Sequence, residues 1–145
     1  MIVIASDHAG VDLKARVLEV VRGAGHEVRD LGPADSSSVD YPDFGHRVAA
    51  AVVAGEVQTG ILICGTGIGM SMTANRHPGV RAALCHDAFT AEMARRHNDA
   101  NVLCMGARVI GGGVAEQVVE VFLSTAFEGG RHQRRVQLIE IERED

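Results

Sequence analysis

The sequence predicts an α/β fold: a single-domain, doubly wound, Rossmann-like sheet of five parallel strands, followed by a C-terminal helix. Two observations lead to this prediction. Short apolar runs alternate with segments whose apolar residues recur at helical spacing, which is the pattern of βαβ units with right-handed crossovers. Several runs are apolar at consecutive positions, as expected for strands covered by helices on both faces. With 145 residues, of which 46% are hydrophobic, the chain can bury one core.

Five apolar runs are predicted to be strands. They are Ile2–Ser6, Glu27–Leu31, Gly60–Cys64, Val80–Cys85 and Asn101–Gly106. The intervening helices are predicted over residues 12–22, 42–54, 68–75, 88–96 and 113–127. Asp87 is a plausible N-cap for the fourth helix, and Gly23 and Gly25 end the first. Ligands of such folds bind at the carboxyl ends of the strands, so the loops after the strands are the candidate site.

Composition argues against several classes of partner. The net charge of -5 and the pI of about 5.8 imply no basic face over the whole chain, so we expect no nucleic acid partner. No apolar run approaches the roughly 20 residues of a membrane span, and the N-terminus lacks the basic lead of a signal peptide. Three cysteines without short spacing favour reduced thiols in a cytoplasmic protein over a disulfide framework.

Three glycines, Gly65, Gly67 and Gly69, follow the third strand and open a helix. Glycines allow close backbone approach and unusual φ angles, so their amides could face an anion, either a phosphate or a reaction oxyanion. The spacing matches neither a P-loop nor the dinucleotide-binding fingerprint. The alternative is a tight strand-to-helix turn that binds nothing.

Cys64 stands directly before this glycine turn, where we expect its thiol to be neither well buried nor paired. A helix N-terminus favours the thiolate form of a cysteine, and Thr66 adds a hydroxyl at the same rim. The alternative is a small buried hydrophobic residue, the usual role of a free cysteine. That alternative is our prediction for Cys85 and Cys104.

Two polar pairs lie beside predicted strands. Asp7 and His8 follow the first strand and could bind sugar hydroxyls or phosphate; the alternative is a helix N-cap with a surface histidine. His97 and Asn98 precede the fifth strand, where His97 could act as a general acid or base near neutral pH. A solvated helix C-terminus is the alternative there. Four other histidines are predicted to be surface or structural residues: His26, His46, His77 and His86.

The arginines of the C-terminal segment suggest a phosphate site. Arg131 and Arg135 are four residues apart, so a helix places both on one face, and two guanidinium groups suit a phosphate. The alternative is a solvated basic face balanced by the acidic tail. Arg108, after the fifth strand, is a third candidate. The tail, residues 131–145, is predicted to be a helix that contacts a second subunit or folds back on its own domain.

Five segments together resemble the type B ribose-5-phosphate isomerases, a family that also includes galactose-6-phosphate isomerase subunits. They are "SDHAG", "DYPDF", "GILICGTGIGMSMTANR", "RRHNDANVLCMGAR" and "FEGGRHQRR". The resemblance covers nearly the whole chain. The glycine segment, "HND" and "GGRHQRR" are jointly specific when they occur in this order.

The resemblance implies an aldose–ketose isomerase that interconverts ribose 5-phosphate and ribulose 5-phosphate without metal or cofactor. It implies that Cys64 is the base that moves a proton between C1 and C2, and that His97, as acid, and Thr66 open the sugar ring. The enediolate oxygen would be stabilised by the amides of the glycine turn: Gly65, Thr66, Gly67, Ile68 and Gly69. Some members lack the cysteine and use a carboxylate from the glycine loop instead; this chain has Cys64, with Ile68 and Met70 in the loop, so it resembles the cysteine branch.

The resemblance also implies how substrate and subunits are arranged. Sugar contacts are expected from Asp7, His8 and Asn98, and phosphate contacts from Arg131 and Arg135 with help from Arg108. Tyr41 and His132 are possible pocket residues. Members of the family are homodimers whose site is shared between subunits, so we expect a homodimer, or a tetramer built as a dimer of dimers.

Three alternatives remain open at this stage. The substrate could be another aldose phosphate: allose 6-phosphate, galactose 6-phosphate or a tetrose phosphate. The three cysteines, Cys64, Cys85 and Cys104, could end neighbouring strands and collect a zinc ion. The chain could also be a non-catalytic module that binds a sugar phosphate, which would need the glycine turn and the arginines but not the thiol.

Overall fold

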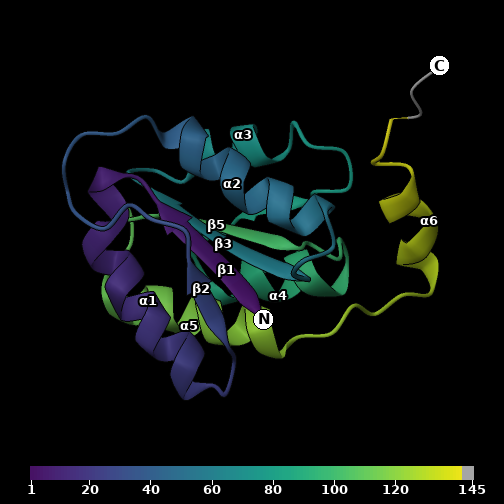
Figure 1. Ribbon diagram of the computed structural model, residues 1–145. Helices are drawn as coiled ribbons and strands as arrows, with labels where there is room; N and C mark the ends of the chain where they lie inside the picture. Colours follow the sequence, from purple (N-terminus) through teal and green to yellow (C-terminus); the bar gives the residue numbers. More distant parts are fainter. Residues whose placement is uncertain (142–145) are drawn as a thin grey trace.

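The computed structural model describes residues 1–141 and contains a five-stranded, all-parallel sheet between two layers of helices (Figure 1). The strands are β1 (Ile2–Ser6), β2 (Val28–Asp30), β3 (Thr59–Cys64), β4 (Ala82–Leu84) and β5 (Val102–Gly106). Their spatial order is β2-β1-β3-β5-β4. The predicted α/β class and the parallel, doubly wound sheet are therefore confirmed.

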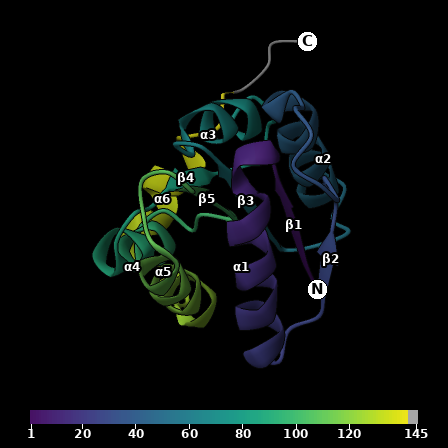
Figure 2. The same cartoon turned by 90° about the vertical axis from the view of Figure 1, so that its left-hand side faces the viewer.

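Helices cover both faces of the sheet. They are the short 3₁₀ helix η1 (His8–Gly10) and the α-helices α1 (Val11–Gly23), α2 (Tyr41–Val53), α3 (Ile68–Ala74), α4 (Ala88–Arg96), α5 (Gly112–Ser124) and α6 (Arg131–Gln137). Helices α1, α4 and α5 pack on one face, and α2 and α3 pack on the other (Figures 1 and 2). Each face thus has its own apolar layer.

The three central strands carry the core. Every residue of β1 and β5 is buried, and so is every residue of β3 except Thr59. Continuous burial explains why these runs are apolar at consecutive positions rather than alternating. The outer strands β2 and β4 have only three residues each and stay partly exposed. They are shorter than predicted because apolar residues near the edge of a sheet can pack against helices without forming the backbone hydrogen bonds of a strand.

Most predicted element boundaries agree closely with the structure. The Asp87 carboxylate accepts a hydrogen bond of 2.7 Å from the Thr90 N–H, which confirms the predicted N-cap of α4. Helix α1 ends at Gly23, and Gly25 adopts a φ of +87° just beyond it. Helix α5 ends three residues before the predicted Phe127, because Thr125 is already extended.

A buried lysine ties the loop after β2 to α1. Lys14 is 2% exposed, and its ammonium donates to Asp30 at 2.9 Å and to the Pro33 carbonyl at 2.6 Å. Further along this loop the Val39 N–H donates to Nδ1 of His8 at 3.2 Å. A buried charge with two acceptors is satisfied, so the loop is fixed over the carboxyl end of β1.

The C-terminal segment forms a separate arm. An extended stretch joins α5 to α6, which stands apart at the right of the molecule in Figure 1. Helix α6 buries Val136, whereas Leu138 and Ile139 beyond it are exposed. The predicted tail helix is thus found over its first half, and residues 142–145 lie outside the described part. Among residues 1–141, no helix is long and apolar enough to cross a membrane.

Candidate active site

The carboxyl ends of β1 and β3 meet at the point where the chain reverses its direction across the sheet. From β1 the chain runs outward to β2, then crosses back to β3 on the other side of β1. Loops at such a switch point diverge and leave a crevice, which is where doubly wound folds bind ligands. The Asp7 N–H donates to the Ile63 carbonyl at 3.0 Å, so the two loops start side by side.

Cys64 ends β3 at this switch point. Its residue exposure is only 4%, so the expectation of a poorly buried thiol is wrong, whereas the expectation that it forms no disulfide is confirmed. The sulfur accepts a hydrogen bond from the Gly67 N–H at 3.1 Å. Cys64 belongs to the buried cluster that β1, β3 and β5 form with α2 and α3, and its sulfur also contacts the glycine turn. The thiol therefore faces the turn rather than pointing into the core alone.

The glycine turn presents a row of backbone amides. Gly67 has a φ of +77°, a conformation that glycine adopts without strain, and this conformation turns its N–H back toward Cys64. The Ile68 N–H donates to the Thr66 hydroxyl at 3.2 Å. Within residues 1–141, the amides of Gly65, Thr66 and Gly69 have no acceptor, so they remain as donors for a ligand oxygen.

Strand β5 fixes this turn from the side. Cys64 is opposite Gly106 in the parallel register, the Cys64 carbonyl accepts from the Ala107 N–H at 2.8 Å, and the Gly65 carbonyl accepts from the Arg108 N–H at 3.0 Å. A Cβ built on Gly65 would lie 3.3 Å from the Arg108 guanidinium. Arg108 thus lies directly beside the turn, on the predicted ligand side.

The side chains of the residues after β1 already make hydrogen bonds to nearby backbone groups. One carboxylate oxygen of Asp7 accepts from the N–H groups of Ala9 and Gly10 at 3.0 and 3.2 Å, so the N-cap alternative describes that oxygen. His8 is half-buried and holds the Val39 amide. Tyr41 packs on the turn: a Cβ at Gly69 would be 2.7 Å from its ring. Asp7, His8 and Tyr41 therefore all lie near Cys64.

His97 and Asn98 lie at the opposite end of the sheet from Cys64, where the strands begin. Helix α4 runs antiparallel to the strands, so His97 at its end returns to the side where strands begin. The Asn98 carbonyl accepts from Arg81, which directly precedes β4. Cys64 is level with the far end of β5, so the length of that strand, about 13 Å at 3.3 Å per residue, separates the two groups. The single chain does not bring them together.

The arm places the phosphate candidates beside His97 instead. The rings of His97 and His132 stack with centroids 4.2 Å apart and planes 15° from parallel. Arg131 and Arg135 share α6 with His132, and both are exposed. Burial, the neighbouring His97 and the guanidinium of Arg131 hold the pKa of His132 below its usual range. The predicted site residues are thus divided into two groups, one at the carboxyl ends of the strands and one at their amino ends.

The other two cysteines behave as the sequence predicted. Cys85 and Cys104 are 1% and 0% exposed, burial raises the pKa of Cys85 to about 11, and burial also raises the pKa of Cys104. Cys104 lies within β5 rather than at its end, so the cysteines do not end three neighbouring strands as the zinc alternative required. Within residues 1–141, no cysteine belongs to a group of three side chains close enough to hold an ion.

Sequence reasoning did not identify the role of His86. Its Nε2 accepts a hydrogen bond of 3.1 Å from the Gly106 N–H, at the end of β5. The His86 ring thereby gives the Gly106 amide, which lies beside the glycine turn, the hydrogen bond that a neighbouring strand would otherwise provide. No pattern in the sequence reveals this contact, because His86 and Gly106 are 20 residues apart.

Fold and family together place the chain among the α/β enzymes of the aldose–ketose isomerase class. The chain belongs to the ribose/galactose isomerase family, whose model matches residues 2–139. Membership in a family of isomerases removes the alternative of a non-catalytic binding module.

Relatives and solved structures agree with this assignment. A putative sugar phosphate isomerase of Bacillus subtilis is 52% identical over 93% of this chain and 91% of its own length. The ribose-5-phosphate isomerase B of Escherichia coli is 46% identical over 92% of this chain and 89% of its own. The ribose-5-phosphate isomerase B of Clostridium thermocellum superposes with a TM-score of 0.93 at 49% identity, covering 95% of this chain and 93% of that one. The Trypanosoma brucei type B enzyme gives 0.93 at 46% identity, covering 95% of each chain.

We expect the substitution Gly106→Ala to damage both stability and activity. Its Cβ would meet the Thr66 backbone at 2.6 to 2.8 Å, so β5 or the glycine turn must move. Overpacking of this kind costs about 1–3 kcal/mol. Urea denaturation measures the loss, and the isomerase assay measures kcat/KM. The control is Gly113→Ala, where a Cβ meets nothing within 4 Å. Equal stability and activity of the two variants would contradict the proposed tight contact.

Proposed function

We propose that this enzyme interconverts ribose 5-phosphate and ribulose 5-phosphate through an enediolate, without a metal ion, and that Cys64 is the base. The observation that carries the proposal is the sulfur of Cys64 beside the glycine turn, 3.1 Å from the Gly67 amide nitrogen. The enzymes of Escherichia coli and Clostridium thermocellum, which are ribose-5-phosphate isomerases by name, support the choice of substrate.

The chemistry requires a base and an oxyanion site that serve adjacent carbon atoms. Cys64 takes the proton from C2 of the open-chain aldose, the hydroxyl proton on the oxygen at C2 moves to the oxygen at C1, and Cys64 returns its proton to C1, which gives the ketose. The negative charge that develops on the oxygen at C1 needs fixed donors, an effect that often contributes about 3 kcal/mol per donor. The amides of Gly65 and Thr66 are available for this role within residues 1–141.

The sulfur also has its own stabilising donor. An N–H group that donates to sulfur stabilises a negative charge there, and the Gly67 amide is held in place by the left-handed conformation of that residue. The low exposure of Cys64 keeps water from competing for the same sulfur. The base is therefore held in place before the substrate arrives.

Ring opening and phosphate binding require the second group of residues, at the other edge of the sheet. We propose a homodimer in which each site takes Cys64, Thr66 and Arg108 from one subunit and His97, Arg131 and Arg135 from the other. Asp7 and His8 on one side and Asn98 on the other bind the sugar hydroxyls. His97 supplies the proton that opens the ring, and the arginines bind the phosphate.

Exposed apolar side chains beside the site support an interface there. Ile68 and Met72, one helical turn apart on α3, are 46% and 66% exposed. Val109, directly after Arg108, is 54% exposed. Apolar residues gathered next to polar site residues are typical of surfaces that a partner covers. A second copy that covers α3 would also enclose the glycine turn.

We expect Tyr41 to limit the length of the sugar. Tyr41 packs against Gly69 and bounds the turn on one side, so a longer sugar has to extend past its ring. We expect ribose 5-phosphate to give the highest kcat/KM in a panel of aldose phosphates with four to six carbons.

For a metal-independent reaction we expect equal rates with and without EDTA. A higher kcat/KM for allose 6-phosphate or a tetrose phosphate would replace the proposed substrate, and loss of activity in EDTA would refute the metal-independent mechanism.

The substitution Cys64→Ala tests the base directly. Without the thiol we expect kcat to fall at least about 10²-fold, because a positioned acid–base group contributes on that order. KM should change little, because the sulfur is proposed to act on the proton rather than to hold the phosphate. The matched control is Cys104→Ala, a buried thiol of the same sheet with no proposed role. Unchanged isomerisation by the Cys64→Ala protein would eliminate Cys64 as the base.

Mixed dimers test the shared site. Chains carrying Cys64→Ala and chains carrying His97→Asn should each be inactive alone. Coexpressed with two different tags, they form heterodimers with one intact site, so the mixture should recover about a quarter of wild-type activity. The control pairs Cys64→Ala with Thr66→Ala, two changes at the same edge, and should recover none. Failure of the first pair to recover activity, with heterodimers isolated, would exclude a site shared in this way.

A further inference from the structure

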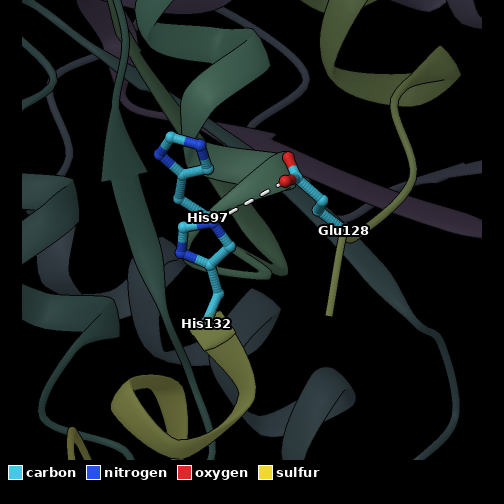
Figure 3. Close-up of side chains that lie close together, drawn as sticks. All are labelled: His97, Glu128 and His132. Carbon is cyan, nitrogen blue, oxygen red and sulfur yellow. Dashed lines mark ion pairs between the residues drawn. The ribbon is translucent and has the colours of Figure 1, made fainter. Parts of the chain in front are cut away.

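Three metal-type ligands gather at the edge of the sheet opposite Cys64. They are His97 at the end of α4, Glu128 in the stretch before α6, and His132 in α6 (Figure 3). One ligand atom from each lies within 4.8 Å of the other two. Among residues 1–141 this is the group of histidine, cysteine, aspartate and glutamate side chains that comes close enough to hold an ion.

His132 supplies an independent sign of a missing partner. The residue is 6% exposed, and its Nε2 is buried without a hydrogen-bond partner among residues 1–141. A carboxylate oxygen of Glu128 is 3.9 Å away, which is too far for a hydrogen bond (dashed line in Figure 3). Buried polar atoms are almost always satisfied, so this nitrogen points to a ligand in the space between the three side chains.

The backbone around the three residues is well anchored. The Glu128 N–H donates to the Arg96 carbonyl at 3.1 Å, which joins the stretch before α6 to the end of α4. The His97 N–H donates to the Met93 carbonyl at 2.9 Å, and the His132 N–H donates to the Gly129 carbonyl at 3.0 Å. Three separate elements thus hold the ligands together, rather than one loose surface loop.

We propose that His97, Glu128 and His132 form a binding site for a zinc-like divalent cation. Two imidazoles and one carboxylate are a common protein ligand set for Zn²⁺, which leaves a fourth position for water. Imidazole ligands select Zn²⁺, Co²⁺ or Ni²⁺ over Mg²⁺ and Ca²⁺, which prefer all-oxygen sites. The ion is not a cofactor of the isomerisation.

Binding requires one imidazole ring to turn. The two rings stack at 4.2 Å, whereas a metal ion lies close to the plane of each ring that binds it. His97 is the ring that turns, because it is half-exposed and no hydrogen bond within residues 1–141 holds it, whereas His132 is buried. The guanidinium groups of Arg131 and Arg135 on α6 repel a cation. We therefore expect weaker binding than at a closed structural zinc site.

The consequence for activity rests on the proposed function. His97 is the proposed acid of ring opening, and an ion on its nitrogen occupies the lone pair that would carry the proton. Zinc should therefore inhibit the isomerase reversibly, and EDTA should restore the rate. Metal binding itself is independent of that role and can be measured without any sugar.

The test titrates the full-length protein with Co²⁺, followed by visible absorption, and with Zn²⁺, followed by calorimetry. We expect one ion per chain, d–d bands of a nitrogen and oxygen site, and no thiolate charge-transfer band, which excludes the cysteines. His132→Asn should abolish binding, and Glu128→Gln, which keeps the shape of an exposed side chain, should weaken it about tenfold or more. The control is His46→Asn, which removes the other close histidine pair, with His77 at 2.7 Å.

Each outcome decides between the proposals. No bound metal, or binding that survives His132→Asn and Glu128→Gln but is lost in His46→Asn, overturns the site. One-to-one binding at this site without inhibition keeps the metal site and argues against His97 as the acid. Absence of isomerase activity in metal-free protein would refute the proposed function while leaving the binding result intact.

Discussion

The register between β3 and β5 is the constraint on which the site depends. It sets Cys64 opposite Gly106 and lets the two residues after β5 donate backbone hydrogen bonds, at 2.8 Å to the Cys64 carbonyl and at 3.0 Å to the Gly65 carbonyl. A slip of one residue would move every side chain to the other face. Arg108 would then leave the side of Gly65, and the space that Gly106 leaves for the Thr66 backbone would be lost. The buried apolar residues on both faces of these strands make such a slip costly.

The same parallel topology explains why the site residues form two groups. Every helix that follows a strand runs back toward the amino ends of the strands. A residue at the C-terminus of such a helix therefore cannot reach a residue at the C-terminus of a strand in the same sheet. His97 belongs to the first kind and Cys64 to the second. A site that needs both therefore needs two copies of the chain, or a much longer loop. The arm that carries α6 beyond α5 adds the proposed phosphate-binding residues to the group at the helix ends (Figure 1).

The sequence predicted the class of fold, the number of strands and most of the helices, because burial on both faces and helical spacing leave direct patterns. It also predicted the N-cap at Asp87 and the burial of Cys85 and Cys104. It could not predict contacts between distant residues. His97 stacks on His132 across 35 positions, and His86 reaches Gly106 across 20. The burial of Cys64 was missed for the same reason, because residues from α2 and α3 cover it.

Three cysteines in one sheet show how position rather than residue type decides chemistry. Cys104 is enclosed within a central strand, and Cys85 follows an outer one; for both, burial raises the pKa and keeps the thiol protonated. Cys64 is almost as buried, yet its sulfur alone among the three accepts a backbone N–H, from a turn in which the amides of Gly65 and Thr66 have no acceptor within residues 1–141. Burial excludes water from all three, but only at Cys64 does the backbone replace the water with a donor. A base needs that combination, because an anion in a dry site is stable only where fixed dipoles point at it.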